Sequence, residues 1–320
     1  MNNVILVKGY AKNIIQNLVK NSFNYVVKSK MKAFKVDDIP KYITPDFISN
    51  TIIKFDDNYY FNKNISTLFS LLSETLCKYI VIEINFNLDI NKFFKLIEYI
   101  NNNNIHQVQF IFNYQEKLIS DEFVTSIYNT NRISTIVVFN SPFEKNLENY
   151  LFFFKQKKQI NFNKKITEFV SNKFLFRESF YQNTYFNKKI FFDSNGNIKN
   201  APECDEIFGN IKEINNPEEL KKIISTPEFQ KYWDVNKDIQ DVCKDCEFRY
   251  MCVDNKIPYQ RTENEWYHKM ECNYNPYIAK WEGEEGYKTL AECGVFSDEN
   301  GFSIDHEKIA AINNELWGED

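Results

Sequence analysis

The sequence of 320 residues predicts an α/β protein, and three observations support this prediction. Apolar runs typical of buried strands alternate with helical patterns from about residue 60 to 162. The composition changes at about residue 186, where turn-forming and cysteine-containing segments begin. Hydrophobic residues make up 43% of the chain and aromatic residues 17%, which is enough for a sizeable core. We therefore expect two domains, at 1–185 and 186–320.

The first expected domain consists of helix–strand units that follow one another along the chain. Helices are expected at 66–76, 90–100 and 120–129, and strands at 79–86, 106–113 and 133–140. Asp89 is a suitable N-cap for the second helix, and the asparagine run at 101–104 ends it. A helix at 147–157 and a strand at 159–163 would repeat the unit. Such alternation is typical of parallel strands with crossover helices, as in an α/β barrel or an open sheet.

The second expected domain has shorter elements. "KKIFFDSNGNIKNA" has the pattern of a β-hairpin that turns at Asn195-Gly196. "PEELKKIISTPEFQKYW", at 217–233, predicts two short helices, each opened by a proline. "DHEKIAAINNEL", at 305–316, predicts an acidic C-terminal helix.

Charge and glycine content argue against several functional classes. The net charge of −5 argues against nucleic acid as the main partner, because phosphate binding needs a basic surface. The start, "MNNVILVKGYAKNIIQNLVK", lacks the apolar region of a signal peptide, and "YIVIEINF" is too short to span a bilayer. We therefore expect a cytoplasmic protein with no membrane partner. Residues 10–195 contain no glycine, which excludes glycine-dependent phosphate loops from that region.

Three cysteines, Cys243, Cys246 and Cys252, form a C-x2-C-x5-C pattern, and Cys272 follows Cys252 after nineteen intervening residues. In a cytoplasmic protein, clustered cysteines favour metal binding or redox chemistry over structural disulfides. Four thiolates complete the shell of one zinc ion or bind one [4Fe–4S] cluster, and the spacing leaves both open. The alternative is that three cysteines are small buried hydrophobic residues and Cys272 is unrelated.

An ordered set of motifs resembles a known family. The segments are "FFDSNGNIKNAPECDEIFGNIKE", "LKKIISTPEFQKYW", "CKDCEFRYMC" and "ECNYNPYIAKW", within about 188–281. Together they resemble a SPASM domain, the C-terminal extension of radical SAM peptide maturases. "DCEFRYMCVDN" and "GYKTLAECGV" resemble the SPASM protein of grasp-with-spasm systems. That protein accompanies an ATP-grasp ligase that modifies a ribosomal precursor peptide.

The resemblance implies one [4Fe–4S] cluster, bound by Cys243, Cys246, Cys252 and Cys272, where a full SPASM domain has two. Cys204 matches the first ligand of the other cluster, but its next ligand position is Ile214. The fourth cysteine of the C-x2-C-x5-C-x3-C run is replaced by Lys256.

The N-terminal half lacks the motif that binds SAM. Radical SAM enzymes use C-x3-C-x2-C there, and only Cys77 precedes Cys204 in this chain. The resemblance therefore implies a degenerate radical-SAM-like partial α/β barrel that binds no SAM, followed by a small metal-stapled SPASM domain. The alternative is an unrelated α/β domain.

Several other residues have two interpretations. Cys293 competes with Cys272 for the fourth ligand position, and the aromatic pattern after Cys272 favours Cys272. His268 has the chemistry of a zinc ligand, although a hydrogen-bonded histidine is the more common case. Cys77 is expected to be a core thiol. Arg249 is expected to bond cluster sulfurs or to pair with Asp245 or Glu247.

Aromatic side chains concentrate around the cysteines. They are Trp266, Tyr267, Tyr274, Tyr277 and Trp281. Such residues are enriched at binding surfaces, and small metal domains also use them as core. The acidic run at 282–286 is expected to be a solvated loop, or to meet a basic leader peptide.

The function expected from the sequence is accessory. The protein would bind a ribosomal precursor peptide, an ATP-grasp ligase or both, with a structural cluster. Two alternatives remain: a redox or electron-transfer protein that uses the cluster, and an interaction protein stapled by one zinc ion.

Overall fold

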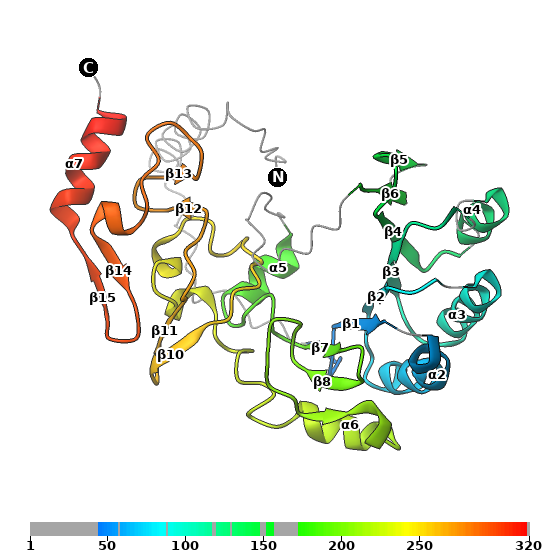
Figure 1. Ribbon diagram of the computed structural model, residues 1–320. Helices are drawn as coiled ribbons and strands as arrows, with labels where there is room; N and C mark the ends of the chain where they lie inside the picture. The colour runs from blue at the N-terminus through cyan, green and yellow to red at the C-terminus, as the bar shows by residue number, and fades with distance from the viewer. Residues whose placement is uncertain are drawn as a thin grey trace, which may run out of the picture. The chain divides into compact units, whose positions relative to one another are not determined.

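The computed structural model describes residues 44–56, 58–87, 89–116, 120–128, 130–147, 152–156 and 172–318. In these ranges the largest sheet has nine strands in the order β5-β6-β4-β3-β2-β1-β7-β8-β9 (Figure 1). Its strands are β1 (Asn50–Phe55), β2 (Tyr79–Ile84), β3 (Gln107–Asn113), β4 (Ile133–Phe139), β5 (Lys145–Leu147), β6 (Phe152–Phe154), β7 (Lys189–Phe192), β8 (Asn197–Lys199) and β9 (Gly209–Asn210).

The centre of this sheet is parallel. β1 pairs with β2 and β7, β2 with β3, β3 with β4, and β4 with β6, all in the parallel sense. The helices between these strands are α2 (Asn58–Glu74), α3 (Ile90–Asn102) and α4 (Asp121–Tyr128). All three lie on one face of the sheet (Figure 1). The expectation of an α/β protein with crossover helices is therefore confirmed.

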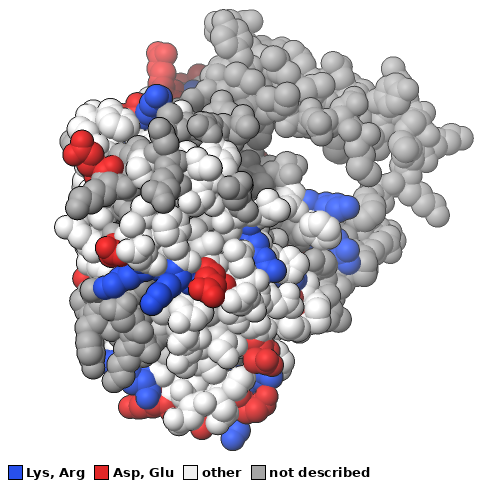
Figure 2. Space-filling view, turned by 90° about the vertical axis from the view of Figure 1, so that its right-hand side faces the viewer, with Lys and Arg blue, Asp and Glu red and all other residues white. Residues whose placement is uncertain are grey.

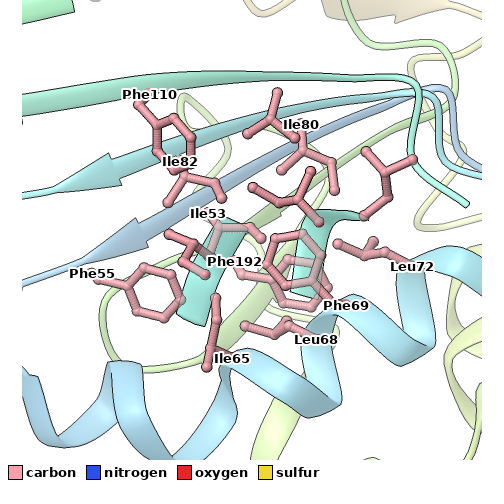
Figure 3. Close-up of a cluster of buried hydrophobic side chains, with 14 of the residues drawn as sticks. Ile53, Phe55, Ile65, Leu68, Phe69, Leu72, Ile80, Ile82, Phe110 and Phe192 are labelled. Carbon is pink, nitrogen blue, oxygen red and sulfur yellow. The ribbon is translucent and has the colours of Figure 1, made fainter. Parts of the chain in front are cut away.

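The main core lies between this face and the helices. Burial alternates along β1, where Ile53 and Phe55 are fully buried. These side chains point toward Leu68 and Phe69 of α2 (Figure 3). On the neighbouring helix, Phe93 packs against rings of β3. The period of two in the strands and of 3.6 in the helices brings the apolar faces together.

Most expected elements are present, with shifts at their ends. Asp89 caps α3 and accepts a hydrogen bond from the Asn91 backbone N–H at 2.9 Å. The hairpin of β7 and β8 turns where expected, and Gly196 has a φ of 86° that favours glycine. α2 begins at Asn58 rather than 66, so the helix has eight more residues at its start than expected.

Two expected helices are wrong. In place of the helix at 147–157, β6 pairs in parallel with β4, and Phe152 and Phe154 are each 1% exposed. Consecutive aromatic residues suit a pleated, half-buried surface, and that tertiary preference decides here. The second short helix within 217–233 is a series of turns that buries Phe229. The expected strand at 159–163 lies outside the described residues.

The remaining elements precede or follow the hairpin of β7 and β8. They are α5 (Lys173–Ser179), α6 (Pro217–Ile224), β10 (Tyr259–Thr262), β11 (Glu265–Tyr267), β12 (Tyr274–Asn275), β13 (Lys280–Trp281), β14 (Val295–Ser297), β15 (Phe302–Ile304) and α7 (His306–Trp317). Four single turns of 3₁₀-helix accompany them: η3 (Ile211–Glu213), η4 (Lys237–Ile239), η5 (Cys243–Asp245) and η6 (Ala291–Cys293). The expected C-terminal helix is confirmed as α7, with Asp305 as its N-cap.

The large sheet continues past residue 185, where the sequence predicts a domain boundary. β7 pairs in parallel with β1, and β8 and β9 extend the sheet beyond β7. Lys188 also bonds Asp46 and Thr44, so the start of the second segment is tied to the start of the described chain. Figure 2 shows basic and acidic side chains interspersed on the described part of one face.

Candidate metal centre

Cys243, Cys246, Cys252 and Cys272 line one cavity of about 40 Å³. The structure thus brings together the four cysteines that the sequence predicts as ligands. The other residues that line the cavity are Lys237, Val242, Phe248, Arg249, Asp254, Tyr274, Pro276 and Trp281. A cavity of this volume has room for more than one water-sized group.

Tight turns direct the first cysteines into the cavity. The backbone N–H of Cys243 donates to the carbonyl of Asp241 at 2.6 Å, across Val242 with a φ of 64°. The N–H of Cys246 donates to the carbonyl of Cys243 at 3.0 Å, closing η5. A positive φ at a β-branched residue is strained, so packing around Val242 must maintain this turn. Cys272 enters from a different segment, just before β12.

The thiols are chemically suited to a soft metal or an iron–sulfur cluster. All four are free of disulfide bonds. Burial raises the pKa of Cys243 to about 11 and that of Cys246 to about 12, and it raises the pKa of Cys252 as well. A metal must replace the thiol protons and would then neutralise the clustered negative charge.

Four thiols are the right ligand type for zinc or for a [4Fe–4S] cluster, but their sulfur atoms would have to move to bind either one. Across the described ranges, no three His, Cys, Asp or Glu side chains stand where they would hold a metal ion. Ligation would therefore draw the four thiols toward the centre of their shared cavity. The tetrahedral sulfur shell of either group is compatible with one loop that supplies three ligands and a second segment that supplies the fourth.

A buried ion pair forms part of the cavity wall. The Lys237 ammonium donates to Asp254 at 2.5 Å, and their side chains are 5% and 4% exposed. Burial alone would raise the pKa of Asp254, but the nearby positive charges, Lys237 foremost, lower that pKa to about 2. Burial would lower the pKa of Lys237, whereas Asp254 and the Cys243 and Cys252 thiols raise it above its usual value. Lys237 therefore remains a cation beside the thiols.

Arg249 takes a partner that the sequence did not predict. Its Nε donates to Asp238 at 2.8 Å, and its guanidinium also donates to the carbonyl of Cys246 at 3.0 Å. The expected pairing with Asp245 or Glu247 is wrong; those carboxylates accept hydrogen bonds from Tyr277 and Tyr274. The second bond fixes the backbone of one cysteine directly.

Aromatic rings form another wall of the cavity. The ring of Tyr274 lies 5.1 Å from that of Phe248 and 4.8 Å from that of Trp281. The Tyr274 hydroxyl donates to Glu247, and the Tyr277 hydroxyl donates to Asp245 at 2.7 Å. These two bonds join the segment after Cys272 to the loop between the first cysteines. The aromatic wall therefore lines the cavity and connects its two cysteine-bearing segments.

Trp266 and Tyr267 belong to a different part of the structure. They lie on β11, and they are 5% and 6% exposed. The carbonyl of Trp266 accepts a bond from the backbone N–H of Asp241 at 2.8 Å. Tyr274 is also buried, at 5%, whereas Tyr277 and Trp281 are partly exposed.

The other cysteines do not line this cavity. Cys293 is fully buried in a separate core cluster, and Asn275 contacts its sulfur at 3.3 Å. Cys204 packs with Phe186 and Ala201. Cys77 is a core thiol, as expected, bonded to the Thr51 hydroxyl at 3.1 Å. The structure thus places Cys272, rather than Cys293, beside the other three thiols.

His268 is hydrogen-bonded, which is the more common case for a histidine than binding zinc. Its Nε2 lies 2.5 Å from Gln240 Oε1, and its Nδ1 lies 3.2 Å from the Ile257 carbonyl oxygen. Burial and the nearby Lys237 lower its pKa to about 4. His268 is not among the residues that line the cysteine cavity.

Sequence reasoning missed Lys237, Asp254 and Phe248 as parts of this site. A lysine six residues before Cys243 and an aspartate two residues after Cys252 carry no recognisable spacing signal. Phe248 lies inside the cysteine loop, where an apolar residue between charged neighbours is a weak indication of burial. Only the tertiary structure shows that these three side chains meet at one cavity.

No family model, curated protein or solved structure matches this chain. The SPASM resemblance therefore rests on the motifs of the sequence itself. None of the helices within the described ranges combines the length and apolar character needed to cross a membrane.

Proposed function

We propose that this protein is an accessory factor in the maturation of a ribosomal peptide, with one structural [4Fe–4S] cluster. The observation that carries the proposal is the gathering of four cysteines around one aromatic-walled cavity. Cys243, Cys246, Cys252 and Cys272 would hold the cluster. When bound, the cluster would supply a strong crosslink between the cysteine loop and the segment that begins at Cys272.

The proposal includes a degenerate radical-SAM-like partial barrel. Its support is the sequential parallel order of β1, β2, β3, β4 and β6, with the intervening helices on one face. Such a sheet curves easily into part of a barrel because each unit adds in the same direction. Cys77, the sole cysteine before Cys204, is bonded within the core. The N-terminal half therefore offers no three-cysteine site for a SAM-binding cluster, and we propose no radical chemistry.

The proposed role of the C-terminal part is to hold a precursor peptide, its ATP-grasp ligase, or both. Buried Trp266, Tyr267 and Tyr274 would support this surface from within. Tyr277 and Trp281 are partly exposed and would make the direct contact. Aromatic side chains with polar handles often dominate interface energies, which favours this segment as the contact.

Co-purification with any ATP-grasp ligase and precursor peptide that neighbouring genes encode tests the proposal. Trp281→Ala should weaken binding by roughly 2 kcal/mol, or about thirtyfold, if this side chain is a central contact. Phe296→Ala is the matched control, because Phe296 is 57% exposed and lies on β14, outside the aromatic segment. Wild-type protein that binds neither component would refute the accessory role.

Metal analysis tests the proposed cofactor separately. Protein prepared without oxygen should be brown and contain about four irons per chain. Colourless protein with one zinc ion per chain would refute the cluster and support the zinc alternative.

A further inference from the structure

A second cavity, of about 340 Å³, lies in the C-terminal part and has no assigned role. Three segments form its walls: the loop after β8, the approach to β10, and the residues that follow β11. The residues that line it are Pro202, Glu203, Asn255, Lys256, Ile257, Tyr259, His268, Lys269 and Met270. Its volume lies at the lower end of the range of small-ligand pockets, about 300–1,000 Å³.

Two lysines give this cavity a positive character. Lys256 makes no hydrogen bond or ion pair with any described side chain or backbone group, although its charge helps lower the pKa of Asp254 and His268. Lys269 lies over the ring of Tyr259, with its Nζ 4.2 Å from the ring centroid. Neither ammonium is therefore neutralised by a direct carboxylate contact among the residues described.

The one carboxylate in the lining is already engaged. Both oxygens of Glu203 accept from the Tyr185 hydroxyl, at 2.9 and 2.8 Å, and Asn255 donates to one of them at 2.7 Å. Both ring nitrogens of His268 are likewise in hydrogen-bond contacts. The lining thus combines two lysine cations with one carboxylate, and leaves an excess of one positive charge in a chain whose net charge is −5.

We propose that this cavity binds a carboxylate that is joined to an apolar group. The carboxylate would lie between Lys256 and Lys269, and its negative charge would balance the excess positive charge of the lining. Pro202, Ile257, Tyr259 and Met270 would contact the apolar part. A phosphate dianion fits less well because Glu203 would repel its second charge. A peptide presents this chemistry at its C-terminus or at an acidic side chain, so the inference extends the proposed function and rests on it for the identity of the ligand.

The first experiment uses a small probe and needs no precursor. Binding of 4-fluorophenylacetate to the metal-loaded full-length protein is measured by ¹⁹F NMR, with 4-fluorophenylacetamide as the neutral match. The acid should bind about tenfold more tightly than the amide, because a charge-assisted bond is lost in the amide. Equal binding of the two compounds would overturn the proposal. So would inorganic phosphate that competes with the probe more strongly than acetate does.

Substitutions of the lining residues test whether the probe binds in this cavity. Lys256→Met and Lys269→Met keep the apolar stems and should each weaken binding by about fivefold. Glu203→Gln should strengthen binding because it removes the one negative charge of the lining. Lys222→Met is the matched control, since Lys222 is an exposed residue of α6 outside the cavity. If Lys256→Met and Lys269→Met, both folded, bind the probe as wild type does, the cavity is not the site.

The precursor peptide then distinguishes the two sources of the carboxylate. A C-terminal amide should abolish competition with the probe if the peptide's C-terminus is bound, and should leave it unchanged if an acidic side chain is bound. If the precursor co-purifies but the probe does not bind, this inference fails and the proposed function stands. If the probe binds but neither the precursor nor the ligase does, the site stands and the peptide-maturation role fails.

Discussion

The Lys237–Asp254 pair permits a quantitative test of what stabilises the cysteine cavity. The two side chains are 5% and 4% exposed, so the pair belongs to the class of buried ion pairs. Breaking such a pair by removing one partner leaves an unpaired buried charge and costs about 3–5 kcal/mol. Lys237→Met removes the cation while it keeps most of the apolar volume. We expect the free energy of unfolding to fall by that amount.

A double-mutant cycle separates the ion pair from other effects. Lys237→Met combined with Asp254→Leu removes both charges, and apolar replacement of a whole buried pair is often close to neutral. The double variant should therefore be more stable than the sum of the two single losses predicts, by about 2 kcal/mol or more. Urea unfolding followed by far-UV circular dichroism measures all four proteins, both metal-loaded and metal-free.

A surface ion pair provides the control for this cycle. Lys221 donates to Glu218 at 2.8 Å, with side chains that are 22% and 72% exposed. Lys221→Met should cost less than about 1 kcal/mol, as exposed pairs do. The reasoning fails if Lys237→Met costs no more than this control, or if the effects at Lys237 and Asp254 are additive. The loss at Lys237 should be larger in metal-loaded protein, where the cation also faces thiolates.

Three further predictions concern the cysteines, SAM and Asp46. Ser replacement of Cys243, Cys246, Cys252 or Cys272 should cause loss of the metal and lower the stability of the C-terminal part, whereas Cys204→Ser and Cys293→Ser should keep the metal. The measurement is the metal content per folded chain. If Cys272→Ser retained the metal, Cys272 would not be a ligand. Reduced, metal-loaded protein should not cleave SAM, and release of 5′-deoxyadenosine would contradict our account of the N-terminal half. Burial alone would raise the pKa of Asp46, but bonds from Ser49 and Lys78 lower it to about 2. The contribution of the Asp46 carboxylate to stability should therefore be complete above about pH 4 and be lost as the pH falls toward 2. The free energies of unfolding of wild type and Asp46→Asn should converge as the pH falls through this window. A difference that stays constant with pH would refute the assignment.

The alternating α/β half was predictable because its signals are local and repeated. In α3, the Asp89 cap and the period of Phe93, Ile97 and Ile100 agree, and the structure has the helix almost where expected. At residues 152–154 the same reasoning failed. The three phenylalanines gain more by pairing beside β4 and burying two rings than a helix of this short segment would offer.

The sequence predicted which four cysteines lie around one cavity, and it did not predict what surrounds them. The C-x2-C-x5-C spacing indicated three of the thiols, and the aromatic pattern after Cys272 indicated the fourth. The partners of Arg249 and the Lys237–Asp254 pair depend instead on how distant turns pack. The aromatic segment shows the same limit. Composition cannot separate a ring that packs inward, such as Tyr274, from one that stays partly exposed, such as Trp281.

Two chain segments contribute to both cavities, which leads to a final prediction. Cys252 and Asp254 line the cysteine cavity, and Lys256, two residues later, lines the second one. Likewise, Lys269 and Met270 line the second cavity shortly before Cys272. Ligation at Cys252 and Cys272 would therefore restrict the backbone that positions both lysines. Without metal, only a fraction of molecules should hold the second cavity in its binding form, and the apparent affinity falls by that fraction.

Removal of the metal by chelation should accordingly weaken binding of 4-fluorophenylacetate by about threefold or more. The comparison uses loaded and stripped wild-type protein under identical reducing conditions, with circular dichroism to establish that the stripped protein keeps its α/β half. Cys204→Ser, stripped in the same way, serves as a control for thiol chemistry outside the cysteine cavity. Restoration of the metal should restore probe affinity. Equal affinity with and without metal would mean that the two cavities are independent, because packing alone then fixes Lys256 and Lys269.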